Sequence, residues 1–185
     1  MISKLEAVAF LQRHQPMSGK EQVDGKCMEK YEEVRRIFIE NPDEECIPLF
    51  LNSFGGKDGL GVYQLVEDVL LMYNTETVLP YLLQSLNSSN DSIKYWSIQI
   101  ASNFPDSRLF TPFSKLLQHQ DEDIKVAVII ALAQLALNDI YAGEIVEMLT
   151  KEYESTSSTY VKEFCNEVLA DLQTELNISE KNEKV

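Results

Sequence analysis

The chain has few cysteines, glycines and prolines for its length, with 3 Cys, 7 Gly and 6 Pro among 185 residues. The cysteines Cys27, Cys46 and Cys165 lie far apart and form no C-x-x-C pair. This spacing argues against a disulfide framework or a zinc site and favours a reducing compartment. Cys46 and Cys165 stand beside helical apolar residues, so we expect both to be small core residues.

Long hydrophobic runs and strand signals are also lacking. No apolar run approaches the roughly 18 residues that a membrane span needs, and the acid at Glu6 argues against a signal peptide. We therefore expect no membrane span and a cytoplasmic location. Runs that alternate apolar and polar residues are absent, so no strand is expected. The sequence predicts an all-α protein.

Basic residues are scarce, since 16 Lys and Arg stand against 30 Asp and Glu, a formal net charge of −14. The acids are spread along the chain and form no acidic tail. Binding to nucleic acid or anionic lipid needs clustered Lys and Arg, so direct contact with DNA, RNA or a membrane is disfavoured. A basic protein partner would be attracted, and its association accelerated. Solubility alone is the alternative explanation of this charge.

What the sequence does contain is a repeat with a spacing of about 31 residues. A first segment occurs three times, each copy with an early proline, at Ile47–Phe54, Leu79–Leu86 and Phe110–Leu117. A second helical segment follows each copy, and Asp91–Ala101 aligns closely with Glu122–Leu132. Because a pair of helices cannot bury its own apolar faces, neighbouring pairs must stack. The repeat therefore predicts a solenoid with a curved binding surface.

The aligned segments resemble the second helix of HEAT repeats. That helix begins in the family with an acid followed by Val-Arg, and Asp123–Leu132 is similar, with Lys125 in place of the arginine. The resemblance covers about residues 43–172, and the spacing is similar to that of the short, phycobilisome-lyase-like HEAT repeats. It implies a right-handed α-α superhelix of four to five helical pairs, a HEAT-like solenoid. Residues 1–176 would form one domain, with 1–42 as a divergent N-terminal cap and 177–185 as a frayed tail.

Individual residues predict where several helices begin and end. Asn41-Pro42 should stop the second helix, and Asn74 should cap a later one. Asp121 precedes the segment Ile124–Leu137, which is nearly all apolar, so we expect this helix to be buried on most sides. A longer loop is expected at Glu154–Ser158, before the last helix.

Three motifs suggest chemistry, but each has a simpler explanation. Asp121-Glu122-Asp123 could ligate a metal, although acids at this place cap a helix and complement its dipole. The segment Gly55–Gly61 follows a helix and lacks the G-K-[ST] ending of a phosphate loop. His14 and His119 each stand in a polar turn, with no nucleophile motif nearby. We therefore expect no catalytic residue, no metal and no cofactor, and we do not expect an enzyme.

The resemblance implies that the second helices line a concave binding surface. On the helix that carries Ile93, the apolar stripe leaves Tyr95 and Gln99 on the other side, with Trp96 at its edge. Exposed Tyr and Trp are typical interface anchors. The alternative is that Trp96 belongs to the core and Tyr95 packs between repeats. The residues expected to bind a partner are Tyr63, Glu67, Asp68, Tyr95, Trp96, Gln99, Asn103, Glu163 and Asn166.

Three hypotheses on function follow. The first is a non-catalytic protein-binding HEAT-repeat module, in its most specific form an acidic immunity or inhibitor protein that neutralises a basic toxin or nuclease. The second is a HEAT-like lyase or chaperone-type accessory protein of an enzyme; a helical-repeat DNA glycosylase would need a groove lined by Lys and Arg, which is lacking. The third is a structural subunit of a larger complex.

Overall fold

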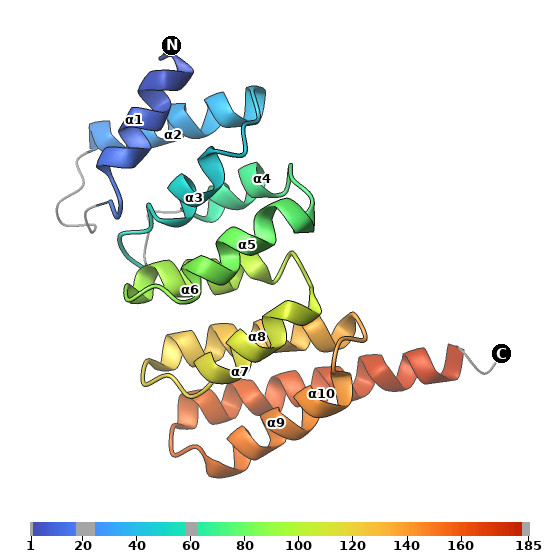
Figure 1. Cartoon of the computed structure of the whole chain (residues 1–185). Helices are drawn as coiled ribbons and strands as arrows, with labels where there is room; N and C mark the ends of the chain where they lie inside the picture. Colours follow the sequence, from blue (N-terminus) through green and yellow to red (C-terminus); the bar gives the residue numbers. More distant parts are fainter. Residues whose placement is uncertain (1, 18–24, 58–62, 183–185) are drawn as a thin grey trace. The chain divides into compact units, whose positions relative to one another are not determined.

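The computed structural model describes residues 2–17, 25–57 and 63–182, with side chains to residue 176, and the regular secondary structure of this part is all helical (Figure 1). The described residues form ten α-helices and two short 3-10 helices, with no strand. The all-α prediction is therefore confirmed for this part of the chain. None of the helices described is both long and apolar enough to cross a membrane. By the density of their contacts the residues divide into two compact units, Met1–Ile100 and Ala101–Val185.

The first unit contains α1 to α6, and α6 ends at the boundary between the units. α1 packs on α2, which follows it in the chain. The other main contacts between α-helices of this unit join each helix to the second helix after it. α3 packs on both α1 and α5, and α4 packs on α2. The elements are α1 (Lys4–Arg13), α2 (Gly25–Glu40), α3 (Cys46–Leu51), η1 (Tyr63–Leu65), α4 (Val66–Leu70), α5 (Thr75–Ser85) and α6 (Asp91–Ala101).

Aromatic side chains fill the core of this unit. The Phe50 ring lies edge-on to the rings of Tyr31 and Phe38, with centroids 5.8 and 5.7 Å apart. All three are fully buried, and burying such a ring contributes roughly 1.5–3 kcal/mol to stability. The Tyr31 hydroxyl lies 2.8 Å from the Ser53 hydroxyl, so the phenol is buried with a hydrogen bond. Burial raises the pKa of Tyr31 far above its usual value.

Helix ends in the first unit follow the sequence signals. α2 ends at Glu40, directly before Asn41-Pro42, as predicted. The Asn74 side chain accepts a hydrogen bond from the Thr77 backbone N–H at 3.0 Å, which confirms the predicted cap of α5. At the start of α1, Ser3 and Glu6 form a reciprocal capping box that the sequence analysis did not identify.

The second unit is built around α8. This helix packs against α7, α9 and α10 and buries residues on nearly all of its faces, as its apolar sequence predicts. Its start is capped by Asp121, whose side chain accepts hydrogen bonds from the backbone N–H groups of Asp123 and Ile124. The elements are η2 (Ser107–Leu109), α7 (Phe110–Leu116), α8 (Glu122–Leu137), α9 (Ala142–Ser155) and α10 (Thr159–Asn182).

Two boundaries in this unit differ from the prediction. The loop expected at Glu154–Ser158 is shorter, because α9 continues to Ser155. The polar residues there have no Gly or Pro to end the helix, and the Ser155 hydroxyl donates to the Lys151 carbonyl at 2.7 Å. α10 runs past Leu176 to Asn182, so it includes the first residues of the segment predicted as a frayed tail.

Candidate functional site

Five of the nine residues expected to bind a partner lie around one hollow of the first unit. This hollow has a volume of about 190 Å³ and separates the η1–α4 segment from α6. We call it the α4–α6 hollow. Its lining residues are Tyr63, Gln64, Glu67, Tyr95, Trp96, Gln99 and Ile100.

Two aromatic residues of the α4–α6 hollow hold the backbone that follows α3. The Trp96 indole N–H donates to the Gly56 carbonyl at 2.8 Å, and the Tyr63 hydroxyl accepts from the Gly55 N–H at 3.1 Å. Trp96 is 7% exposed and Tyr63 3%, with their rings 5.9 Å apart. Burial also raises the pKa of Tyr63. The structure therefore favours the alternative in which Trp96 is a core residue, and neither ring is an exposed anchor.

The accessible groups of the α4–α6 hollow come from its other residues. Glu67, Tyr95 and Gln99 are half-buried, and Gln64 is exposed. The Tyr95 ring stands edge-on to the Trp96 ring, with centroids 5.5 Å apart. The Lys57 ammonium lies 5.8 Å from the Tyr95 centroid, within the range of a cation–π interaction. One carboxylate, two amides and one aromatic ring thus surround a space that suits a cationic or hydrogen-bonding side chain.

The remaining four predicted residues lie outside this hollow. Asp68 faces α2, where its carboxylate lies 3.3 Å from the Arg35 guanidinium. Arg35 also binds Glu32 on its own helix, with N–O distances of 2.7 and 2.8 Å. Asp68 therefore helps to join α4 to α2. The other three, Asn103, Glu163 and Asn166, are exposed residues of the second unit.

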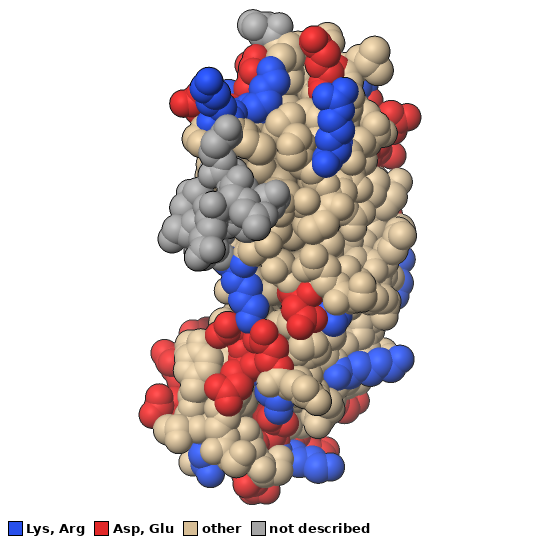
Figure 2. Space-filling view, turned by 90° about the vertical axis from the view of Figure 1, so that its left-hand side faces the viewer, with Lys and Arg blue, Asp and Glu red and all other residues tan. Residues whose placement is uncertain are grey.

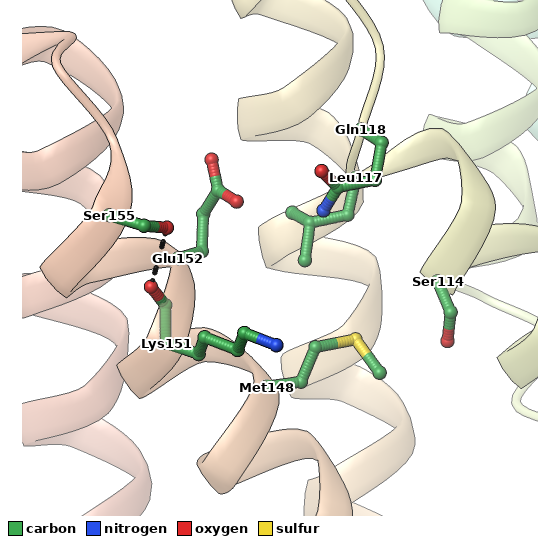
Figure 3. A pocket seen from close by; sticks show the side chains of 7 residues that line it. All are labelled: Ser114, Leu117, Gln118, Met148, Lys151, Glu152 and Ser155. Carbon is green, nitrogen blue, oxygen red and sulfur yellow. Dashed lines mark hydrogen bonds between the residues drawn. The ribbon is translucent and has the colours of Figure 1, made fainter.

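A larger hollow of about 300 Å³ lies in the second unit, and the sequence analysis did not identify it (Figure 3). We call it the α7–α9 hollow. Its clearest sequence signal is Glu152, an acid that continues the buried stripe of Ile145 and Leu149 on α9. The Glu152 carboxylate is bound by the Lys125 ammonium of α8 at 2.7 Å. The lining residues are Ser114, Leu117, Gln118, Met148, Lys151, Glu152 and Ser155.

The motifs considered for chemistry have structural roles where they are described. The cap formed by Asp121 confirms the structural explanation of that acidic motif. Within the described residues, no group of three or more His, Cys, Asp or Glu side chains is placed to hold a metal ion. His14 lies at the end of α1, with Nδ1 2.8 Å from the Phe10 carbonyl, and His119 Nδ1 accepts from a backbone N–H. In the segment Gly55–Gly61, residues after Lys57 lie outside the described part.

Both units carry an excess of acid. Residues 1–100 hold 15 Asp and Glu against 9 Lys and Arg, and residues 101–185 hold 15 against 7. Figure 2 shows a face on which Lys and Arg lie among the acidic side chains, beside a broad area without charge. The chain matches no protein-family model and no curated protein.

Proposed function

We propose that the protein is a HEAT-like solenoid that binds another protein and carries out no chemistry of its own. Equivalent positions of the repeat have equivalent structures, which supports the solenoid. Oδ1 of Asn90 accepts from backbone N–H groups two and three residues on, at 2.9 and 3.4 Å. Oδ1 of Asp121 does the same at 3.0 and 3.3 Å. Ile93 and Ile124, which follow these caps, are both buried.

The packing of helices within each unit also supports stacked pairs. In the first unit α3 packs on α1 and α5, and α4 packs on α2. In the second unit the most extensive contact joins α8 to α10. Contacts between every second helix are those that stacked helical pairs require, since each pair covers the apolar face of the next. We infer HEAT-like repeats over about residues 43–172, with residues 1–42 as the cap of a single domain.

The α4–α6 hollow is the observation that carries the binding function. It brings Glu67 and the amides of Gln64 and Gln99 to the ring of Tyr95. Because the Glu67 carboxylate and the amide oxygens of Gln64 and Gln99 are hydrogen-bond acceptors, the site is suited to a Lys or Arg side chain, which would take the place of Lys57 beside the ring. A net charge of −14 attracts a partner that presents such side chains. We therefore propose that the partner is a basic protein.

The most specific form of this proposal is an immunity or inhibitor protein. A toxin that cleaves nucleic acid needs a basic surface to bind phosphates. A compact acidic protein that covers that surface would block the substrate and inhibit the toxin. The α4–α6 hollow would take one basic side chain of the toxin, and the overall charge would accelerate the encounter.

The test is direct binding to the product of the neighbouring gene. We expect a complex whose Kd rises with salt, and we expect Glu67→Lys to weaken it by roughly tenfold or more. Glu147→Lys is the matched control, because it changes net charge equally at an exposed position of α9 that lines neither hollow. Equal losses in both variants would show that only net charge matters. A neighbouring product that is not basic, or is not bound, overturns the inhibitor proposal.

A DNA-binding function is distinguished by a separate measurement. The charge argument predicts no micromolar affinity for DNA at low salt, where phosphate contacts are strongest. Fluorescence anisotropy of a labelled duplex measures this affinity. Micromolar binding would contradict the proposal and favour an enzyme that acts on nucleic acid.

A further inference from the structure

The α7–α9 hollow has a buried carboxylate, of which only one oxygen accepts a hydrogen bond from a described residue. Glu152 is 6% exposed, and its Oε1 accepts from Lys125 Nζ at 2.7 Å. No described residue donates to Oε2. Among the described residues, Ser97 Oγ is the one fully buried side-chain polar atom that lacks a partner, so Oε2 keeps some accessible surface, and Glu152 lines the hollow. Figure 3 shows the carboxylate directed into this space.

A cation of the same helix, Lys151, also lines the hollow. Figure 3 shows the Lys151 side chain extended along the wall towards Met148. None of the described acids forms an ion pair with Lys151. The amide of Gln118 adds a second donor. The hollow therefore holds one anionic acceptor and one cationic donor that do not pair with each other.

The two hydroxyl groups at the wall offer acceptors. Ser114 Oγ donates to the Phe110 carbonyl at 2.8 Å, and Ser155 Oγ donates to the Lys151 carbonyl at 2.7 Å. Each hydroxyl proton is thus used within its own helix, and only the oxygen lone pairs remain. Leu117 and Met148 supply the apolar part of the lining.

We propose that the α7–α9 hollow binds a free α-amino acid with an apolar side chain. The ligand ammonium would donate to Glu152 Oε2, and its carboxylate would accept from Lys151. Its side chain would lie against Leu117 and Met148. The Glu152 carboxylate would repel a simple anion, and the Lys151 ammonium would repel a simple cation. A ligand that carries both charges therefore fits best. A volume of about 300 Å³ is at the lower end of the range for small-molecule sites.

L-leucine is the probe, and two analogues that each lack one charge are its controls. Isoamylamine has no carboxylate, and 4-methylpentanoate has no ammonium. We expect L-leucine to bind with a Kd that is roughly millimolar or tighter and to shift the amide NMR signals of α7 and α9. Both analogues should bind at least roughly tenfold more weakly, because each loses a charge-assisted hydrogen bond. Binding of either analogue as tightly as leucine, or no shift with any of the three, overturns the proposal.

Variants locate the site independently of the analogues. Lys151→Gln should weaken L-leucine binding by roughly tenfold or more, because the carboxylate loses its cation. Lys115→Gln is the matched control, an exposed lysine of α7 that does not line the hollow. Glu152→Gln should also weaken binding, provided that circular dichroism shows an unchanged fold. Equal affinities of the Lys151 and Lys115 variants for L-leucine would overturn the proposal that the ligand binds in the α7–α9 hollow. This test does not depend on any protein partner, so its result is separate from that for the proposed function.

Discussion

The Lys125 ammonium on α8 lies 2.7 Å from the Glu152 carboxylate on α9, and both side chains are largely buried. Because α8 is surrounded by α7, α9 and α10, this ion pair joins the central helix of the second unit to a neighbour. Lys125→Met would leave the carboxylate buried without a cation. We expect it to lower the free energy of unfolding by about 3 kcal/mol, measured by urea denaturation.

The first unit offers a matched control at the equivalent repeat position. Lys94 pairs with Asp91 at 2.8 Å, but the Asp91 side chain is 49% exposed. Lys94→Met should therefore cost less than about 1 kcal/mol. Replacing both members of the buried pair, Lys125→Met with Glu152→Met, should recover most of the lost stability, because no buried charge remains. Equal costs of the two single lysine variants would contradict this account.

The cap of α8 gives a second stability prediction. Asp121 accepts hydrogen bonds from two backbone N–H groups at the start of the helix, at 3.0 and 3.3 Å. Asp121→Ala should lower the free energy of unfolding by about 1 kcal/mol. Glu122→Ala is the control, since this exposed acid interacts only with the helix dipole. The substitution should lower the free energy of unfolding by only a few tenths of the loss expected for Asp121→Ala. An equal loss in both variants would mean that charge, and not the cap, stabilises the helix.

The features that the sequence could predict depend on residues close together in the chain. The stop at Asn41-Pro42 and the caps at Asn74 and Asp121 use contacts within a few residues, and the structure has all three. The role of Trp96 could not be settled in this way, because its indole donates to the Gly56 carbonyl, 40 residues earlier. A position at the edge of an apolar stripe is compatible with either a core residue or an anchor.

The α7–α9 hollow escaped prediction for a related reason. Its wall joins α9 to α7 and the two residues that follow α7, and the chain separates these segments by all of α8, so no local pattern contains the hollow. Glu152 is the only local sign, and a single acid in an apolar stripe is too weak to predict a binding site. Five residues of the α4–α6 hollow were predicted, because the resemblance to HEAT repeats implied that the second helices line one surface.

Cysteine reactivity tests the predicted burial of two thiols. Cys46 and Cys165 are fully buried, as expected from the sequence, and burial raises the pKa of each thiol to about 11. At pH 8 only about one in a thousand of these thiols is ionised, so they should react slowly with a disulfide reagent such as DTNB. Cys27 is half-buried and should account for the fast phase. We expect one fast thiol in the folded protein and three after denaturation. A fast phase that persists in Cys27→Ser would contradict this prediction.

Acid sensitivity should arise in part from the pairing of Glu32 with arginine. Hydrogen bonds from Arg35, and secondarily from Arg36, lower the pKa of Glu32 below its usual 4.5. A carboxyl group whose pKa is lower in the folded than in the unfolded state stabilises the fold above its unfolded pKa. This contribution is lost as the pH falls through the folded pKa. The free energy of unfolding should therefore decrease with acidification below about pH 4.5, the usual value for Glu.

Two variants of α2 isolate the contribution of Glu32. Glu32→Gln removes the titrating group, so the free energy of unfolding should depend less steeply on pH below the usual value for Glu. Glu29→Gln is the control, because Glu29 is an exposed acid of the same helix that forms no ion pair with a described residue. Urea denaturation at a series of acidic pH values measures both slopes. If the two variants lose stability in parallel with the unsubstituted protein, the Arg35–Glu32 pair is not a source of the acid sensitivity, and protonation of other carboxylates must explain it.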